Sequence, residues 1–355
     1  MGESDHIVAD AAEKILADLA DPQTVNSAKD ESWKKTLWTA LEENGLTLPW
    51  VSEQHGGSGA SLAEGFEVLT TSGKFALGVP LAETMLAGWL LSQADLASPA
   101  GAMSVVPAHP KDKITLNGDG TLSGRARNIP FAREAAHFAV LAHGAKGISI
   151  ALVKASDCRR DEDVNLAGEP LDGLILDKVG PEQIGAAPKG VDQTALMLMG
   201  GVVRSLQIAG ALQTMLTRTV NYANERTAFE RKISKFQAVQ HNLARLAGEV
   251  AAATAAASSA ADTLAGAPAW DDDATYLEAT AAKIRCAEAA GLGSAIAHQV
   301  HGAIGFTEEH VLHRFSLRAL GWRDDFGNES YWAVELGNRI GQRGADDLWP
   351  LVASR

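Results

Sequence analysis

The chain has 355 residues, of which 46% are hydrophobic, and a formal net charge of −13 at pH 7. This length accommodates two or three packed domains, and the composition is typical of a globular chain. The negative charge argues against a nucleic-acid partner and against a basic surface for membrane docking.

The cysteines and the N-terminus indicate the compartment. Cys158 and Cys286 lie far apart in no metal-ligand spacing, which favours a reduced cytoplasmic setting without disulfides or a metal site. Residues 1–6 lack the basic and apolar regions of a signal peptide. Apolar runs such as residues 197–203 are too short to span a bilayer. We therefore expect a soluble, cytoplasmic protein without membrane insertion.

Residues 1–101 are predicted to form a helical domain. Apolar side chains recur at helical spacing over residues 7–19 and 33–41, and Asn44 and Gly45 are suited to end the second helix. Residues 48–59 then form a glycine-rich connector. Because this connector lacks the lysine and the strand-to-helix context of a phosphate loop, it is interpreted as a tight turn between helices.

Residues 102–190 are predicted to form a β domain. Short β-prone runs alternate there with clusters of Gly, Pro, Asn and Asp, which mark turns. The runs lie at residues 105–106, 114–116, 138–141, 148–153 and 174–176. This pattern predicts a small antiparallel barrel or sandwich inserted between helical segments.

Residues 191–355 are predicted to return to helix. Helical patterns cover residues 209–222, 238–264, 276–298 and 331–340, and a polar break at residues 266–273 separates the second from the third. Alanine dominates two of these segments. Small residues with high helix propensity let helices pack closely, so a helical bundle is expected.

Two motifs carry residue types that a flat, phosphate-bearing cofactor requires. The first, Arg226 to Gln237, sets a fixed cation, two aromatic rings and an amide on a predicted turn between helices. The second, Gln299 to Phe306, is punctuated by glycines, so that bare backbone can approach a ligand. A guanidinium suits the charge of a diphosphate, and aromatic faces suit the rings.

In this order, the two motifs resemble those of the acyl-CoA dehydrogenase family, and the resemblance covers nearly the whole chain. It implies an α+β multidomain fold with an N-terminal helical domain, a middle β-barrel and a C-terminal four-helix bundle. It also implies FAD as cofactor, an acyl-CoA thioester as substrate and an electron-accepting flavoprotein as redox partner. The residues that it implies for FAD binding across a subunit interface are Arg226, Phe229, Ile233, Phe236, Gln237, Gln299, Val300, Gly302 and Ala303.

The chain departs from the family motifs at two places. Glu230 stands where glycine is usual, so the turn is expected to bend differently, and Ala303 replaces the second glycine of the later motif. The methyl group of Ala303 would crowd the backbone approach to a cofactor. His301, beside the glycine turn, is interpreted as a structural residue and not as a base.

The catalytic base of the family has no counterpart at either of its usual places. Family chemistry requires a carboxylate that takes a proton from the acyl α-carbon. Counting from the two motifs puts the alternative base positions at Phe326 and Gly200. Asp325 is retained as a weak candidate, against the simpler interpretation that Asp324 and Asp325 form a solvated acidic turn.

The segments that cover the flavin ring in family members also differ here. Residues 104–110 replace the usual barrel-entry loop, and residues 123–130 replace the later strand, in which Pro130 cannot donate a ladder hydrogen bond. The sequence therefore favours the small, base-lacking subunit of an α2β2 acyl-CoA dehydrogenase acting on a bulky acyl-CoA, with a larger family member as partner. A self-sufficient homo-oligomeric dehydrogenase and a non-enzymatic flavin- or acyl-CoA-binding protein are the alternatives.

Overall fold

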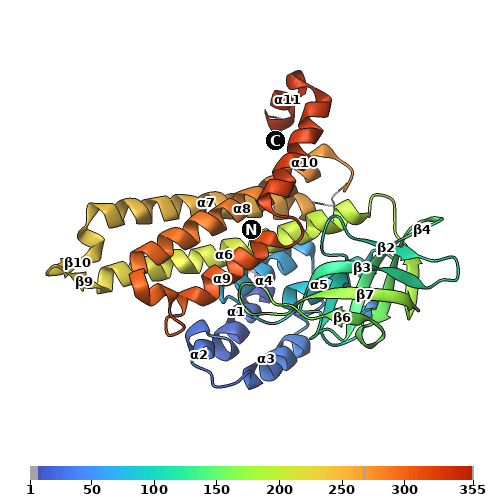
Figure 1. Cartoon of the computed structure of the whole chain (residues 1–355), viewed down its shortest axis with the longest axis horizontal. Helices are drawn as coiled ribbons and strands as arrows, with labels where there is room; N and C mark the ends of the chain where they lie inside the picture. The colour runs from blue at the N-terminus through green and yellow to red at the C-terminus, as the bar shows by residue number, and fades with distance from the viewer. Residues whose placement is uncertain (1–6, 267–268, 354–355) are drawn as a thin grey trace.

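The computed structural model describes residues 7–266 and 269–353, and within them it has the predicted three-part architecture (Figure 1). N-terminal helices are followed by a β domain, and the chain ends in a bundle of long helices. The change from helix to strand falls between Ser92 and Met103, and the change back falls between Ala186 and Gln193. The predicted fold class is thus confirmed.

The N-terminal helices begin and end at recognisable signals. A capping box at Ser61 and Glu64 starts the fourth helix, and Asn44 ends the third, as predicted. The glycine connector is a tight turn around η1 (Glu53–His55), where a Cβ atom on Gly57 would lie 2.1 Å from the Val51 carbonyl oxygen. The helices are α1 (Ile7–Leu19), α2 (Pro22–Asn26), α3 (Ser32–Glu43), α4 (Leu62–Lys74) and α5 (Leu81–Ser92).

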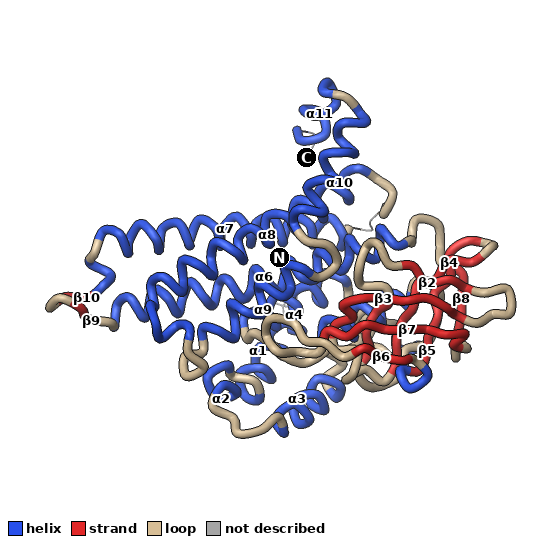
Figure 2. The backbone as a smooth tube through the Cα atoms, viewed as in Figure 1, coloured by secondary structure: helices blue, strands red, loops and turns tan. Residues whose placement is uncertain are grey.

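The β domain is a single eight-stranded sheet (Figure 2). Its ladder runs β6-β7-β3-β2-β4-β5-β8, and β1 pairs with β4. The prediction of an antiparallel domain is wrong for two pairs, because β1 and β2 both lie parallel to β4. The strands are β1 (Met103–Val106), β2 (Lys113–Leu116), β3 (Leu122–Pro130), β4 (His137–Gly144), β5 (Gly147–Lys154), β6 (Arg159–Asp161), β7 (Leu171–Val179) and β8 (Gln183–Ala186).

The bundle is built on one long central helix, α6 (Gln193–Glu225). The predicted start at Ala209 is wrong by 16 residues, because Ala195–Leu212 is buried on every side and shows no polar face to reveal a helical period. By length and composition α6 is the one described helix that would be apolar enough to cross a membrane, yet its most apolar window is 100% buried inside the protein. It is the core helix of the bundle.

The remaining helices pack around α6. In α7 (Gln237–Ala265) and α8 (Asp273–His301), alanines allow the close contact in which the Cys286 sulfur lies 3.4 Å from the Ala253 carbonyl oxygen. The helix α9 (Leu312–Asp324) was not predicted, because polar Ser316 and Arg318 occupy its buried face.

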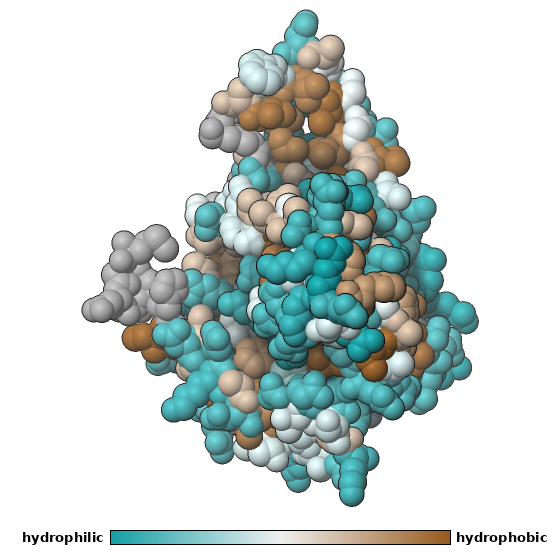
Figure 3. All heavy atoms as spheres, turned by 90° about the vertical axis from the view of Figure 1, so that its left-hand side faces the viewer, coloured by the Kyte–Doolittle hydropathy of each residue, from teal (hydrophilic) through white to brown (hydrophobic). Residues whose placement is uncertain are grey.

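The chain ends in an arm formed by α10 (Glu329–Arg343) and α11 (Leu348–Ala353), which projects from the bundle (Figure 1). Apolar side chains gather on this arm (Figure 3), and Val334, Leu348, Trp349 and Val352 are exposed.

Candidate functional site

The first motif forms the predicted turn between α6 and α7, and the structure builds this turn as a β-hairpin (Figure 1). It pairs β9 (Thr227–Ala228) with β10 (Arg231–Lys232), and both residues of the turn are left-handed, Phe229 at φ 50° and Glu230 at φ 64°. The turn therefore has a conformation that glycine adopts without cost, and Glu230 carries strain instead of bending the chain differently.

The side chains of the hairpin present a cation and an aromatic ring to the outside. Phe229 is 89% exposed, and Arg226 is exposed with no hydrogen bond or ion pair from its guanidinium to any residue that the structure describes. Phe236 is held in place, with Arg231 stacked over its ring at 4.0 Å and the Phe229 ring edge-on at 6.2 Å. Sequence reasoning gave Arg231 no role, although its place between the two aromatics was a usable signal.

The second motif lies at the end of α8. Gln299 and Val300 are on its last turn, and Gly302 and Ala303 begin η4 (Gly302–Phe306). Gly302 has φ 67° and ψ −149°, a conformation available to glycine alone, and open space lies where its Cβ would be. Gln299, Gly302 and Ala303 are exposed along a mostly apolar groove of about 710 Å³, whereas Val300 is buried.

The fold brings the two motifs to the same end of the bundle. Tyr222, on the last turn of α6, stacks on His301 of α8 with ring centroids 4.4 Å apart. Its hydroxyl donates a hydrogen bond to the His301 carbonyl oxygen at 3.2 Å. His301 is buried and packs in this contact, in keeping with a structural role.

The two base positions of the family also meet in space. A Cβ atom on Gly200 would lie 2.5 Å from the ring of Phe326, so the aromatic ring rests directly on the helix backbone. Phe326 is 2% exposed, and its carbonyl oxygen accepts a hydrogen bond from Trp332 Nε1 at 3.0 Å. An apolar ring therefore fills the point on which both positions converge.

Asp325 is part of a buried charge network rather than of a solvated turn, so that expectation is wrong for this residue. Arg204 Nε donates to Asp325 at 2.9 Å, and the same guanidinium pairs with Glu83 and donates to Gln207 at 2.6 Å. Burial raises the pKa of Asp325 and of Glu83, and the charge of Arg204 opposes this shift. Asp324 is exposed and pairs with Arg323, as a solvated turn predicts.

Sequence reasoning missed most of this network. Arg204 is the signal that could have found it, because a single arginine inside the apolar Ala195–Leu212 stretch requires buried acids as partners. Nearby, Lys283 Nζ donates to the carbonyl oxygens of Trp322 and Arg323 at 2.7 and 2.9 Å, and burial lowers the pKa of Lys283 to about 8. Both buried cations near Phe326, Arg204 and Lys283, therefore have partners within the chain.

The barrel-entry segment is closed by its own polar contacts. Arg127 donates to Asp112 from Nε at 2.9 Å and from Nη2 at 2.7 Å. Gln193 Nε2 donates to the carbonyl oxygens of Pro110 and Asp112 at 2.9 and 2.8 Å, which ties the segment to the start of α6. A cavity of about 410 Å³ remains between this segment and residues 327–331.

Comparison with known proteins shows which proteins this chain is similar to. Residues 190–327 match the model of the acyl-CoA dehydrogenase C-terminal domain. Acyl-CoA dehydrogenase IpdE2 of Mycobacterium tuberculosis is 26% identical over 90% of this chain and 92% of its own length. A 3-(aryl)acrylate reductase of Clostridium sporogenes is 27% identical over 63% of this chain and 60% of its own length.

Solved structures show the same fold. The ChsE4-ChsE5 complex from Mycobacterium tuberculosis aligns with a TM-score of 0.82 and 22% identity, covering 97% of this chain and 100% of the matched one. A variant of the Tcur3481-Tcur3483 steroid ACAD aligns with a TM-score of 0.81 and 23% identity, covering 94% and 97%. The chain thus shares the acyl-CoA dehydrogenase fold, and its residues 190–327 match the C-terminal domain of that family.

Proposed function

We propose that this chain is the base-lacking subunit of a heteromeric acyl-CoA dehydrogenase that carries out α,β-dehydrogenation of an acyl-CoA thioester with FAD. The observation that carries the proposal is the contact between Phe326 and Gly200, which leaves neither family position with a carboxylate. The exposed Arg226 hairpin stands in contrast, because it offers ligand-binding groups that nothing in the described chain occupies.

The residues of the hairpin and of the α8 end fit part of an FAD molecule held mainly by a neighbouring subunit. Arg226 would pair with the diphosphate, and the Phe229 face would stack on a ring. The open space above Gly302 would admit the cofactor to the backbone, with Gln299 beside it. When bound, FAD supplies the acceptor for the hydride that leaves the acyl β-carbon.

This division of labour assigns the remaining tasks to a larger subunit. That subunit would provide the carboxylate base and the cradle for the flavin ring, in an α2β2 assembly. The chain's segment at Pro110 and Asp112 is tied to Gln193 and Arg127, which is consistent with its having no flavin ring to cover. Its own part would be to complete the cofactor site at the diphosphate through Arg226 and along the adenosine through Phe236 and Gln237.

The comparisons support this assembly and its substrate class. One related structure is a complex of two named chains, and another is described as a steroid ACAD. We therefore propose a bulky acyl-CoA as substrate, a role in lipid or steroid degradation, a cytoplasmic location and a flavoprotein as electron acceptor. An electron-transferring flavoprotein of Acidaminococcus fermentans also shares this fold, with a TM-score of 0.81 and 20% identity.

Co-expression tests the proposal directly. The chain alone is expected to be colourless or poorly soluble, and to become yellow and active in acyl-CoA-dependent dye reduction with a longer family member encoded beside it. A bright yellow, active homotetramer from this chain alone would refute the heteromer and favour a self-sufficient dehydrogenase. Dye reduction that stays absent with every acyl-CoA and with the larger subunit would favour a non-enzymatic binding protein.

A further inference from the structure

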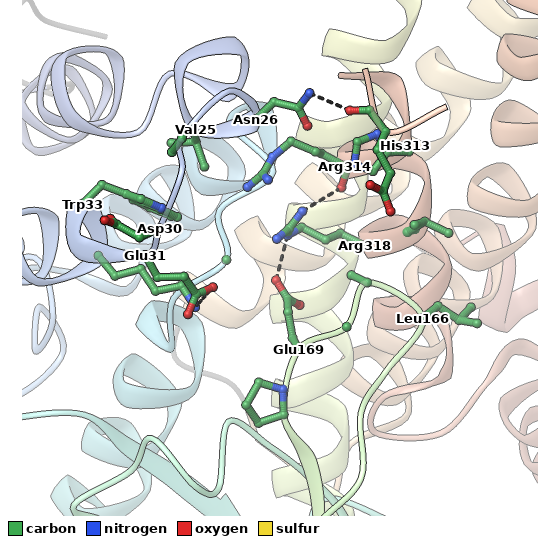
Figure 4. A pocket seen from close by; sticks show the side chains of 18 of the residues that line it. Val25, Asn26, Asp30, Glu31, Trp33, Leu166, Glu169, His313, Arg314 and Arg318 are labelled. Carbon is green, nitrogen blue, oxygen red and sulfur yellow. Dashed lines mark hydrogen bonds and ion pairs between the residues drawn. The ribbon is translucent and has the colours of Figure 1, made fainter. Parts of the chain in front are cut away.

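A further cavity lies beside the α8 groove. It has a volume of about 920 Å³ and opens between the α2–α3 segment, the loop before β7 and the N-terminal half of α9 (Figure 4). It has no lining residue in common with the cavities around Phe326, and it borders the α8 groove at Phe306, His313 and Leu317. Its size is within the range of small-molecule sites.

The walls of this cavity are braced by contacts between segments distant in sequence. Asn26 Nδ2 donates to the Glu308 carbonyl oxygen at 2.9 Å, which joins α2 to the loop before α9. Arg318 Nε donates to Glu169 at 2.8 Å, and Arg318 Nη1 donates to the Arg314 carbonyl oxygen at 3.1 Å (Figure 4). These contacts hold the walls of the cavity together from within the chain.

Arg314 is the arginine lining this cavity that makes no ion pair with a described residue. Lys34 pairs with Glu31 at 2.8 Å, and Arg318 pairs with Glu169. The guanidinium of Arg314 makes no ion pair with any described residue, and its buried Nε has no hydrogen-bond partner there. Burial, together with repulsion from Arg318, lowers the pKa of Arg314 to about 10. An unpaired cation in such a place is unfavourable unless an anion joins it.

The rest of the lining defines which anion fits. Acidic and basic side chains balance each other in the lining, so it carries no net positive charge to favour a multiply charged phosphate. A single carboxylate matches the unpaired guanidinium of Arg314 in a bidentate pair. Apolar surface stands opposite, from Trp33, Val25 and Leu166. The acidic lining residues are Asp30, Glu31, Glu134, Glu169 and Glu308.

We propose that this cavity is a binding site for an organic monocarboxylate with a ring-shaped apolar body, whose carboxylate pairs with Arg314 and whose body lies against Trp33. Neither FAD nor the acyl-CoA chemistry proposed above takes part in this site. The proposal therefore stands or falls independently of the heteromer.

Calorimetric titration tests this site with naphthoate as the probe, in the same full-length assembly for every arm and without acyl-CoA. One naphthoate is expected to bind per chain, and Arg314→Gln is expected to weaken its binding at least tenfold. The matched control Arg323→Gln, on the same helix but paired with Asp324 outside the cavity, should change the affinity less than twofold. Naphthalenemethanol, which has the same body without the charge, should bind at least tenfold more weakly.

A second variant guards against misfolding of the Arg314 mutant. Leu166 is 56% exposed at the mouth of the cavity, so Leu166→Glu leaves the core intact and adds a repelling charge. It should also weaken naphthoate binding at least tenfold. The proposal is overturned if naphthoate does not saturate, if both variants bind it as the unmodified protein does, or if inorganic phosphate binds more tightly than naphthoate.

Discussion

Arg226 is the single side chain on which the proposed cofactor half-site depends most directly. Its guanidinium is exposed on the hairpin and has no ion-pair partner in the described chain, so it is available to a diphosphate. Arg226→Ala should remove a charge-assisted contact worth about 1.5–3 kcal/mol, which is about a tenfold to hundredfold loss of FAD affinity. Arg226→Lys should keep part of the FAD affinity, because the lysine ammonium keeps the positive charge but cannot donate two parallel hydrogen bonds as a guanidinium does.

The measurement is the FAD content and FAD dissociation constant of the assembled enzyme. Lys235→Ala is the matched control, since Lys235 is an exposed cation of the same hairpin segment outside the motif positions. Equal FAD affinity in Arg226→Ala, Arg226→Lys and Lys235→Ala would assign Arg226 to the surface alone.

The substitution Asp325→Asn tests whether Asp325 is a catalytic base or an acid that stabilises the fold. Asp325 is paired with the buried Arg204. Breaking a buried ion pair typically costs about 3–5 kcal/mol, so Asp325→Asn should lower the free energy of unfolding by up to that amount. The loss is smaller if the Asn side chain keeps a hydrogen bond to Arg204. Turnover at equal FAD content should change less than about fivefold, since removing a true general base costs about two to four orders of magnitude. Thermal melting and dye reduction separate the two effects.

Asp324→Asn serves as the control for that substitution. Asp324 is exposed and pairs with Arg323 on the surface, so both melting temperature and turnover should stay close to those of the unmodified protein. A hundredfold loss of turnover in Asp325→Asn with FAD still bound would make Asp325 catalytic and this chain self-sufficient.

At the scale of elements, the hairpin turn carries a testable strain. Glu230 has φ 64°, and a left-handed conformation costs a non-glycine residue about 1–2 kcal/mol. Glu230→Gly should therefore stabilise the protein by about 0.5–1 kcal/mol, after allowing for the greater freedom of glycine in the unfolded chain. Urea unfolding measures this. The same change at Glu13, inside α1, should instead destabilise by about 1 kcal/mol.

The histidines at the end of α8 and in the segment before α9 predict a dependence of stability on pH. Burial lowers the pKa of His298, His301 and His310 below the ordinary value, so the folded state prefers these rings neutral. Their contribution to stability is complete above about pH 6.5, the unfolded pKa, and is lost as pH falls through the folded values. On account of these rings, the melting temperature should fall as the pH is lowered below about 6.5.

His310→Gln should make that fall shallower, because one of the three groups no longer titrates. His241→Gln, at an exposed position of α7, should leave the profile unchanged. A melting temperature that rises on acidification would contradict the assignment of these rings as neutral packing residues.

The elements that could be predicted from the sequence are those that carry a local signal of their own, such as a β-prone run, a turn motif or a capping residue. The strand at residues 148–153, the hairpin at Arg226 and the C-cap at Asn44 are of this kind. The early turns of α6 could not be predicted, since a helix buried on all sides has no polar face. The helix α9 could not be predicted either, because Arg318 lies on its buried face. The partner of Arg318 is Glu169, which is 149 positions away in sequence.

Alignment with the family motifs located both base positions, but only the structure shows that Phe326 lies on Gly200. That contact joins residues 126 positions apart, and no local pattern encodes it. The unpaired guanidinium of Arg314 was equally hidden, because its surroundings come from three segments of the chain. Long-range pairing of charges is therefore the part of the site that the sequence leaves open.

At the scale of the whole molecule, the chain combines a closed internal centre with open outer surfaces. The region around Phe326 and Arg204 is filled and internally paired, whereas the hairpin, the α8 end and the apolar C-terminal arm face outward. A chain built this way would contribute to a neighbour's site and to assembly, rather than carry out the proton transfer itself.

This asymmetry predicts where turnover is lost in the assembled enzyme. Replacing the catalytic carboxylate of the larger subunit by its amide should reduce acyl-CoA-dependent dye reduction by about two to four orders of magnitude while FAD stays bound. Phe326→Glu in this chain should not rescue that loss. The new carboxylate would be buried beside Asp325 and Glu83, and Arg204, which pairs with both, would leave it without a cation of its own. Phe326→Leu controls for the loss of the ring and should leave turnover within about fivefold, below the cost of removing a general base. Rescue by Phe326→Glu would show that this centre still receives substrate, and the division of labour between the two subunits would then be wrong.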